Sequence, residues 1–211
     1  MLALTYEFLD RKLIARFQNR IGPRWYQTVA DIVKLLIKEE ITPATAHPTL
    51  FGVLPVVAMS GVLTAALYVP LLGFPSAFGF KGDLIVTLYL LSLITMCIGV
   101  AGWNSTSRFT MVGATRAFTE YSGRGLGFFH LAKEMELVVG MTLIAALYMG
   151  GIANPLEFFI KTLILLAILA SLHCVLTRLR IDQTVGLWWR YGAAVVLLQW
   201  LVLIAWRGMV A

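Results

Sequence analysis

The sequence predicts an all-α fold, a polytopic bundle of membrane helices with one amphipathic helix at the cytoplasmic surface. Among the 211 residues, 59% are apolar and only 13% are charged, whereas a soluble domain of this length needs more polar surface to cover its core. The mean hydropathy is strongly positive, which is typical of an integral membrane protein. The charged residues also gather in short segments that separate long apolar runs.

The chain begins with nine mainly apolar residues, MLALTYEFL, before Asp10. About 20 residues are needed to cross a bilayer, so residues 1–9 cannot span it alone. The stretch also lacks the basic start and the small-residue cleavage site of a signal peptide. We therefore expect residues 1–9 to be a partial helix, the end of a membrane helix.

Residues 10–40 are the most basic segment and contain seven of the 17 Lys and Arg residues. The sequence RIGP at residues 20–23 predicts a break in any helix before Trp25. From Thr28 onward, apolar residues recur with helical spacing at Val29, Ile32, Val33 and Leu36, while Asp31, Lys34 and Lys38 share the opposite face. This pattern predicts a basic turn followed by an amphipathic helix on the membrane surface.

Five mainly apolar runs predict membrane spans. They cover about residues 50–72, 84–103, 126–153, 158–177 and 187–206. The first run contains Pro55, which membrane helices tolerate when neighbours satisfy the freed carbonyl. With the preceding segments, these spans form one membrane domain over residues 1–211.

The basic residues alternate across these spans. Segments on one side hold thirteen Lys and Arg residues and segments on the other side hold two. The positive-inside rule therefore places the basic loops in the cytoplasm and explains the net charge of +6 without a nucleic-acid partner. Cys97 and Cys174 lie inside apolar runs, where a thiol behaves as a small hydrophobe, so neither a disulfide nor a metal site is predicted.

Motifs for redox or nucleotide chemistry are absent from the sequence. It contains no G-x-x-x-x-G-K-[ST] loop, no G-x-G-x-x-G turn, no C-x-x-C pair and no clustered His. We therefore expect no catalytic residue, no metal site and no redox cofactor bound by this chain. The function is expected to be anchoring, conducting or binding.

The third predicted span carries four ionisable residues in its first half, at His130, Lys133, Glu134 and Glu136. An uncompensated charge inside the bilayer costs roughly 2.5 to 3.5 kcal/mol on insertion scales, so such residues usually have a function. Three interpretations are open: this half of the helix faces a polar subunit interface, it carries a proton path, or it does neither.

Six motifs occur in order along the chain: RFQNRIGP (16–23), ADIVKLLIKEE (30–40), GWNSTS (102–107), GATR (113–116), TEYSG (119–123) and RLRIDQ (178–183). Together they resemble the membrane-anchor, or heel, subunit of respiratory complex I and of the related energy-converting membrane-bound hydrogenases, the complex I subunit 1 family. Each motif alone is weak. In register over nearly the whole chain, they make the resemblance specific.

The resemblance implies a non-catalytic membrane subunit of a multi-subunit oxidoreductase in the prokaryotic cytoplasmic membrane. Such a subunit docks the peripheral electron-transfer arm and links it to the proton path. Its expected partners are peripheral hydrogenase-like subunits that carry iron–sulfur clusters and nickel–iron or flavin, antiporter-like membrane subunits, and lipid; a quinone is a further expected ligand. The resemblance places the docking or quinone interface at Arg20, Gly22, Pro23, Asp31, Lys34, Lys38, Glu39, Glu40, Arg108, Arg116, Glu120, Tyr121, Arg178, Arg180 and Asp182. It leaves the proton path at His130, Lys133, Glu134 and Glu136.

The stretches RIGPRWYQTVAD and LAKEMEL favour the hydrogenase branch of this family. The quinone-site subunit of an NADH:quinone oxidoreductase is the alternative. Two other classes stay open: a small secondary transporter or channel with its binding site at the four ionisable residues, and a structural membrane protein. The chain shows no similarity between its halves, although transporters usually contain an internal repeat.

The chain departs from the family in two places. The first family helix is represented only by residues 1–9, and the family's segment between GATR and TEYSG, which supplies two helices and an acidic loop, is absent. Either the protein is a short member, or stretches are missing before Met1 and between Arg116 and Thr119, which we favour. Missing stretches predict one overlong Cα–Cα step from Arg116 to Thr119, because neighbouring Cα atoms lie about 3.8 Å apart. They also predict an empty groove between the second and third spans.

Overall fold

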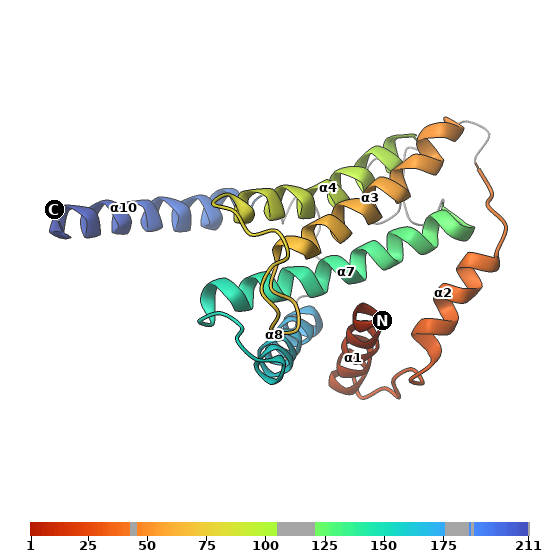
Figure 1. Cartoon of the computed structure of the whole chain (residues 1–211), viewed down its shortest axis with the longest axis horizontal. Helices are drawn as coiled ribbons and strands as arrows, with labels where there is room; N and C mark the ends of the chain where they lie inside the picture. Colours follow the sequence, from red (N-terminus) through yellow and green to blue (C-terminus); the bar gives the residue numbers. More distant parts are fainter. Residues whose placement is uncertain (43–45, 105–120, 176–185, 187, 211) are drawn as a thin grey trace. The chain divides into compact units, whose positions relative to one another are not determined.

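The computed structural model describes residues 1–42, 46–104, 121–175, 186 and 188–210 (Figure 1). Every regular element in this part of the chain is helical, so the all-α prediction is confirmed. Residues 1–171 form one compact unit, and residues 172–211 form a second unit.

Helix α1 spans Leu2–Phe17 and therefore continues past Asp10, further than the partial helix expected for residues 1–9. Charges are tolerated in it because Arg11 forms an ion pair with Glu7 one turn earlier. The helix ends at Asn19, which has a φ of +57°. There the amides of Asn19 and Arg20 donate to the carbonyls of Arg16 and Ala15, which is the Schellman pattern of a helix end.

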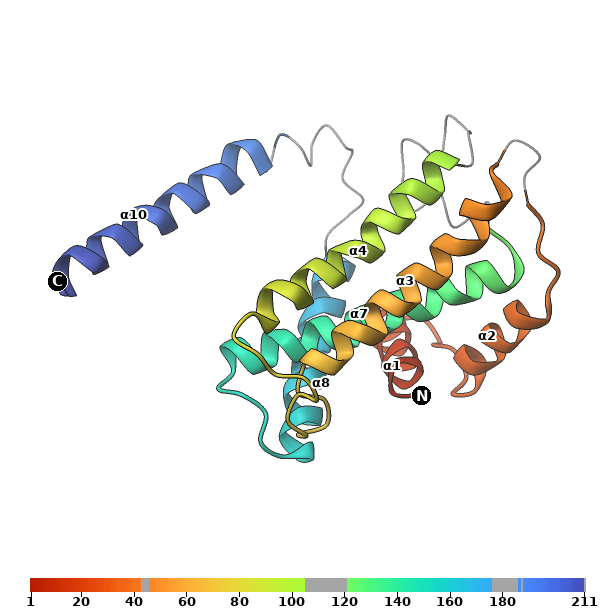
Figure 2. The same ribbon diagram turned by 45° about the horizontal axis from the view of Figure 1, so that its top comes forward.

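Helix α2 spans Gln27–Ile37 and occupies the stretch predicted to be amphipathic. Its apolar face is divided between two surroundings. Ile32 is buried against the bundle, whereas Val33 and Leu36 are exposed. Helix α2 packs on α1 and on α7, so it lies along the side of the membrane helices (Figures 1 and 2).

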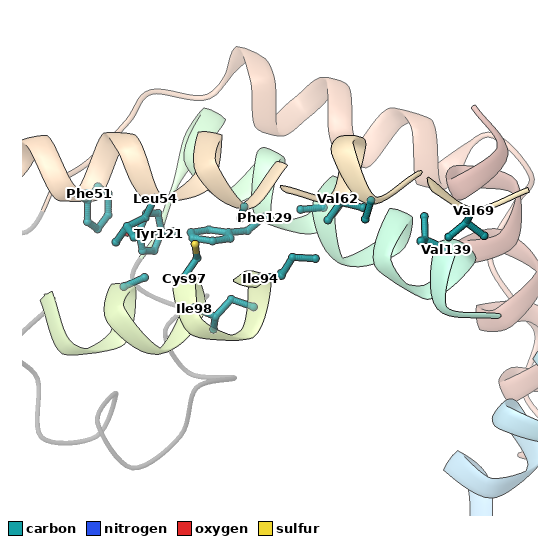
Figure 3. Close-up of a cluster of buried hydrophobic side chains, with 14 residues drawn as sticks. Phe51, Leu54, Val62, Val69, Ile94, Cys97, Ile98, Tyr121, Phe129 and Val139 are labelled. Atoms are coloured by element: carbon teal, nitrogen blue, oxygen red, sulfur yellow. The ribbon is translucent and has the colours of Figure 1, made fainter. Parts of the chain in front are cut away.

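Three long helices form the centre of the first unit: α3 (Pro48–Tyr68), α4 (Asp83–Asn104) and α7 (Gly123–Tyr148). Helix α3 begins with Pro48 in its first turn, which suits the fixed φ of proline. It packs on both α4 and α7, and α4 and α7 also touch. The core between them contains Phe51, Val62, Ile94, Cys97 and Phe129 (Figure 3).

Helix α8 spans Pro155–Val175 and packs in the first unit through its residues up to Ser171. Phe158 and Leu166 of α8 are fully buried in a cluster with Tyr6 of α1. The Tyr6 hydroxyl lies 2.5 Å from Oγ1 of Thr162, so a hydrogen bond joins α1 to α8 inside this cluster. In the second unit, a π-helical turn (Trp188–Gly192) leads into α10 (Ala193–Val210).

Three of the helices in the described residues are long and apolar enough to cross a membrane, namely α3, α4 and residues 155–174 of α8. Helix α7 has 26 residues but carries Lys133, Glu134 and Glu136 in its first half. Each predicted span thus coincides with a helix, with ends that differ by a few residues.

The expected overlong step between Arg116 and Thr119 lies outside the described residues. The expected gap between the second and third spans falls on described helices. Helices α4 and α7 touch, and beside their contact a groove of about 360 Å³ is lined by residues of α4, α7 and α8. The two helices therefore neither separate completely nor close fully on each other.

Candidate functional site

A polar pocket of about 320 Å³ lies where α1, α2 and α7 meet. Its ionisable lining comes from all three helices and consists of Glu7, Arg11, Asp31, Lys34 and His130. Apolar residues complete the walls: Ile32, Leu35 and Leu126. The pocket thus joins the amphipathic helix to a membrane helix that carries intramembrane charges.

Arg11 connects α1 to α2 in this pocket. Its guanidinium pairs with Glu7 in its own helix, and its Nη1 lies 3.4 Å from Oδ2 of Asp31 in α2. Glu7 is only 5% exposed. Because an ionised carboxylate is costly to bury alone, Arg11 acts as its counterion and at the same time holds Asp31 against α1.

The four ionisable residues of α7 divide between two surroundings. His130 lines the polar pocket, and Glu134, one turn later, interacts electrostatically with Glu7, Asp10 and Arg11 of α1. Lys133 and Glu136 line the separate groove beside α4 and α8.

Helical geometry explains this division. At about 100° per residue, His130 and Glu134 lie about 40° apart around the helix axis, and Lys133 and Glu136 lie about 60° apart, so each pair shares a face. The single cluster expected from the sequence is therefore two pairs that meet different neighbours.

Glu7 and Arg11 are site residues that the sequence analysis missed. It treated residues 1–9 as the end of a membrane helix and residues 10–40 as a basic turn with a helix. The available signal was the carboxylate of Glu7 inside an apolar stretch, with Arg11 four residues later. That spacing allows an ion pair within one helix.

The segment after α2 is fixed to the start of α7 by Ser122 and Gly123, which we call the Ser122–Gly123 clamp. The amide of Ile41 donates to Oγ of Ser122 at 2.8 Å, and that hydroxyl donates to the carbonyl of Glu39 at 3.4 Å. Gly123 has a φ of +61°, and a Cβ there would lie 2.8 Å from the carbonyl oxygens of both Lys38 and Glu39. Only glycine allows this close approach without strain.

Tyr121, expected on the docking face, lies in the core instead. Its ring stacks on Phe51 with centroids 3.8 Å apart and meets Phe129 edge-on at 5.1 Å. The side chain is 3% exposed, and within the described residues its hydroxyl has no hydrogen-bond partner. Burial raises the pKa of this hydroxyl above its ordinary value. The expectation for the Tyr121 side chain is corrected because aromatic packing between α3 and α7 takes it inside.

The other expected docking residues fall into two groups. Those on the surface of the first unit are Arg20, Lys34, Lys38, Glu39 and Glu40, which are exposed, and Gly22, Pro23 and Asp31, which are partly buried. A Cβ at Gly22 would lie 3.3 Å from Lys12, so the loop packs closely on α1 there. Outside the described residues lie Arg108, Arg116, Glu120, Arg178, Arg180 and Asp182.

The side chains that could ligate a metal are dispersed. Among the residues that the structure describes, no group of three or more His, Cys, Asp and Glu side chains is arranged to hold a metal ion. Cys97 is buried in the core and Cys174 is partly buried, and both are free thiols. The chemistry of the described site is therefore that of carboxylates, a guanidinium and an imidazole.

Comparisons with known proteins give consistent similarities. A protein family described as NADH dehydrogenase matches residues 1–119 and 117–205. The H subunit of the NADH-quinone oxidoreductase of Dehalococcoides mccartyi strain CBDB1 is 23% identical over 274 aligned residues, which cover 89% of this chain and 78% of that protein. The second H-type protein of the same name from Syntrophobacter fumaroxidans is 25% identical over 302, covering 98% and 91%. Hydrogenase-4 component C of Escherichia coli K12 is 35% identical over 119, covering 56% and 38%.

The alignments also indicate where the relatives are longer. Two of them extend over 274 and 302 residues, more than the 211 residues of this chain, so the relatives contain residues without a counterpart here. The family match divides at residues 117–119. This point lies between α4 and α7, where the sequence analysis expected a segment to be absent.

We predict that Arg11→Gln lowers the stability of the protein, because it leaves the buried Glu7 carboxylate without its counterion. The expected loss is on the order of 2 kcal/mol, less than for a fully buried pair because the arginine is partly exposed to solvent. The double variant Glu7→Gln/Arg11→Gln should recover most of the loss. Thermal unfolding in detergent measures both. Equal stability of the single and double variants would contradict the counterion role.

We also predict that Gly123→Ala loosens the Ser122–Gly123 clamp, since the added Cβ meets two carbonyl oxygens and the residue needs a positive φ. Gly140→Ala is the matched control, because a Cβ there meets nothing within 4 Å. Limited proteolysis of residues 38–46 should become several-fold faster in Gly123→Ala only. Unchanged cleavage in both variants would show that the clamp does not hold this segment.

Proposed function

Because the chain belongs to the NADH dehydrogenase family, the family of complex I subunit 1, we propose that it docks a peripheral electron-transfer arm and couples that arm to ion movement in the membrane. The chain is a multi-pass membrane subunit of a complex I-like oxidoreductase. The proposal concerns how this subunit works, which residues it uses and which branch it serves.

One observation carries the proposal: the polar pocket shared by α1, α2 and α7. Through Arg11, a surface helix is tied to a membrane helix pair with the carboxylates Glu7 and Glu134 on its inner side. A change in charge or position at α2 is therefore felt by groups in α7. Such a connection is what a subunit needs if electron transfer outside the membrane is to drive ion movement inside it.

Docking is supported by the charged surface beside this pocket. Lys34 and Lys38 of the α2 region are exposed, as are Glu39 and Glu40 in the segment that follows. Exposed charges of both signs favour a partner with a complementary charged surface, which sets orientation and association rate more than affinity. We place this face, with α2, on the cytoplasmic side of a prokaryotic cytoplasmic membrane, following the distribution of basic residues.

The proton path is supported by the arrangement of titratable groups. Asp31, Glu7, His130 and Glu134 follow one another from the surface helix into α7, around a pocket with room for several water molecules. A carboxylate inside a membrane protein is costly unless it is paired or takes part in ion transfer. We propose that Glu134 accepts and releases the proton and that His130 connects it to the pocket.

For the branch of the family, we favour an energy-converting hydrogenase, on the stretches RIGPRWYQTVAD and LAKEMEL. Its peripheral subunits would carry iron–sulfur clusters and nickel–iron, and its membrane neighbours would be antiporter-like. A quinone site is the second candidate. The pocket combines Ile32, Leu35 and Leu126 with His130 and Asp31, a lining that suits a ring with two carbonyl oxygens and an apolar tail.

We predict that Glu134→Gln lowers the number of ions moved per electron while the complex still assembles, because the amide keeps the shape but cannot titrate. Glu157→Gln in the first turn of α8 is the control. Ion uptake and electron transfer, measured together in membrane vesicles, give the ratio. An unchanged ratio in Glu134→Gln would leave this residue a structural role only.

We predict that Lys34→Glu/Lys38→Glu weakens retention of the peripheral arm at least tenfold, because two charges on the docking face are reversed. The control is Lys81→Glu, an exposed residue between α3 and α4 that the charge distribution places on the other side of the membrane. The measurement is the iron content that co-purifies with the subunit at rising ionic strength. Equal retention in all variants would argue against docking through α2.

A further inference from the structure

Lys133 and Glu136 are intramembrane charges outside the polar pocket. They border the groove of about 360 Å³ that also contains Leu91 of α4, Leu169 of α8, and Leu137, Gly140, Met141 and Ile144 of α7. The lining is apolar except for these two side chains. The proposed proton path through Glu134 leaves them without a role.

Their depth makes lipid an unfavourable neighbour. Helix α7 has 26 residues, about 39 Å at 1.5 Å per residue, and Glu136 lies close to its midpoint. Lys133 is exposed and Glu136 is partly exposed at this level. Acyl chains offer no hydrogen bond, and a charge at the bilayer centre costs roughly 2.5 to 3.5 kcal/mol on insertion scales. The two residues interact with each other, but an ammonium and a carboxylate can each form more hydrogen bonds than one ion pair uses.

The shape of the groove fits a helix. Glu136, Gly140 and Ile144 follow at intervals of four and line one stripe of α7. A Cβ at Gly140 would meet nothing within 4 Å, so the backbone of α7 is accessible there. Small residues at such positions let two membrane helices approach closely, while leucine and isoleucine on either side supply packing.

The comparisons add an independent observation. The family match divides at residues 117–119, and the longer relatives carry additional residues that this chain lacks. Helices α4 and α7, which precede and follow that point, are the helices that frame the groove. Relatives therefore have additional protein at the place in the chain where this protein has an open apolar surface with two charges.

We propose that the groove receives a transmembrane helix of a partner subunit, with a polar side chain that hydrogen-bonds Glu136 and an acceptor near Lys133. Helix α7 then serves two partners: its His130–Glu134 face meets α1 and α2, and its Lys133–Glu136 face meets the partner helix. This inference rests on the proposed function only in requiring a multi-subunit membrane complex.

The test uses the assembled complex with a photoreactive p-benzoylphenylalanine in place of Ile144, in the groove, or of Ile164, an exposed residue of α8 outside the groove lining. The expected product at position 144 is a cross-link to a membrane-spanning peptide of another subunit that contains a polar residue, identified by mass spectrometry. Position 164 is expected not to capture that peptide. Capture at position 144 of lipid alone, or only of residues 105–120 or 172–211 of this chain, would overturn the proposal.

Two substitutions test the chemistry of the groove. Gly140→Trp fills it and should reduce co-purification of the cross-linked subunit at least tenfold, whereas Ile164→Trp should not. Glu136→Leu should also reduce it, and Glu136→Gln, which keeps an acceptor, should retain most of it. Iron content and Glu134-dependent coupling are measured in the same samples. Loss of the membrane partner with retention of iron separates failure at the groove from failure of the docking proposal. Unchanged co-purification in both Gly140→Trp and Glu136→Leu would refute the groove as the binding site.

Discussion

The arrangement of the first unit depends on the charges that Arg11 gathers. One guanidinium pairs with Glu7 in α1 and reaches Asp31 in α2, and its field extends to His130 and Glu134 in α7. A buried carboxylate such as Glu7 is tolerated only beside such a partner. Arg11 therefore does more than extend α1 past its apolar start. It determines which face of α2 lies against the bundle, and it connects surface charges to intramembrane charges.

A second constraint acts at the other end of α2. The Ser122–Gly123 clamp fixes residues 38–41 against the start of α7, and Tyr121, next in the chain, is locked between Phe51 and Phe129. Helix α2 is thus tied to α7 at its C-terminal end by hydrogen bonds and close backbone contact, and to α1 through Asp31 by charge. A docking helix held at two points transmits displacement to the membrane helices instead of moving independently of them.

The sequence predicted the helices well because membrane spans depend on long apolar runs, which composition alone reveals. It failed where tertiary contacts decide. The end of α1 moved from Asp10 to Phe17 because an ion pair and a left-handed Asn19 replaced the expected break. Tyr121 was placed on a surface, since nothing in TEYSG indicates that Phe51, seventy residues earlier, stacks on its ring. The spacing of His130, Lys133, Glu134 and Glu136 gave their pairing but not which neighbouring helix each pair meets.

That division of α7 bears on how coupling works in the proposed complex. Glu134 and Glu136 are two residues apart, so they lie on different sides of one rigid helical turn. If the polar pocket and a partner helix occupy these two sides, a small rotation or shift of α7 changes the surroundings of both carboxylates together. Charge changes near Arg11 would then reach a neighbouring membrane subunit without any ion crossing α7 itself. The physical requirement is only that α7 moves as a unit, and the absence of proline from its 26 residues favours an unbroken helix.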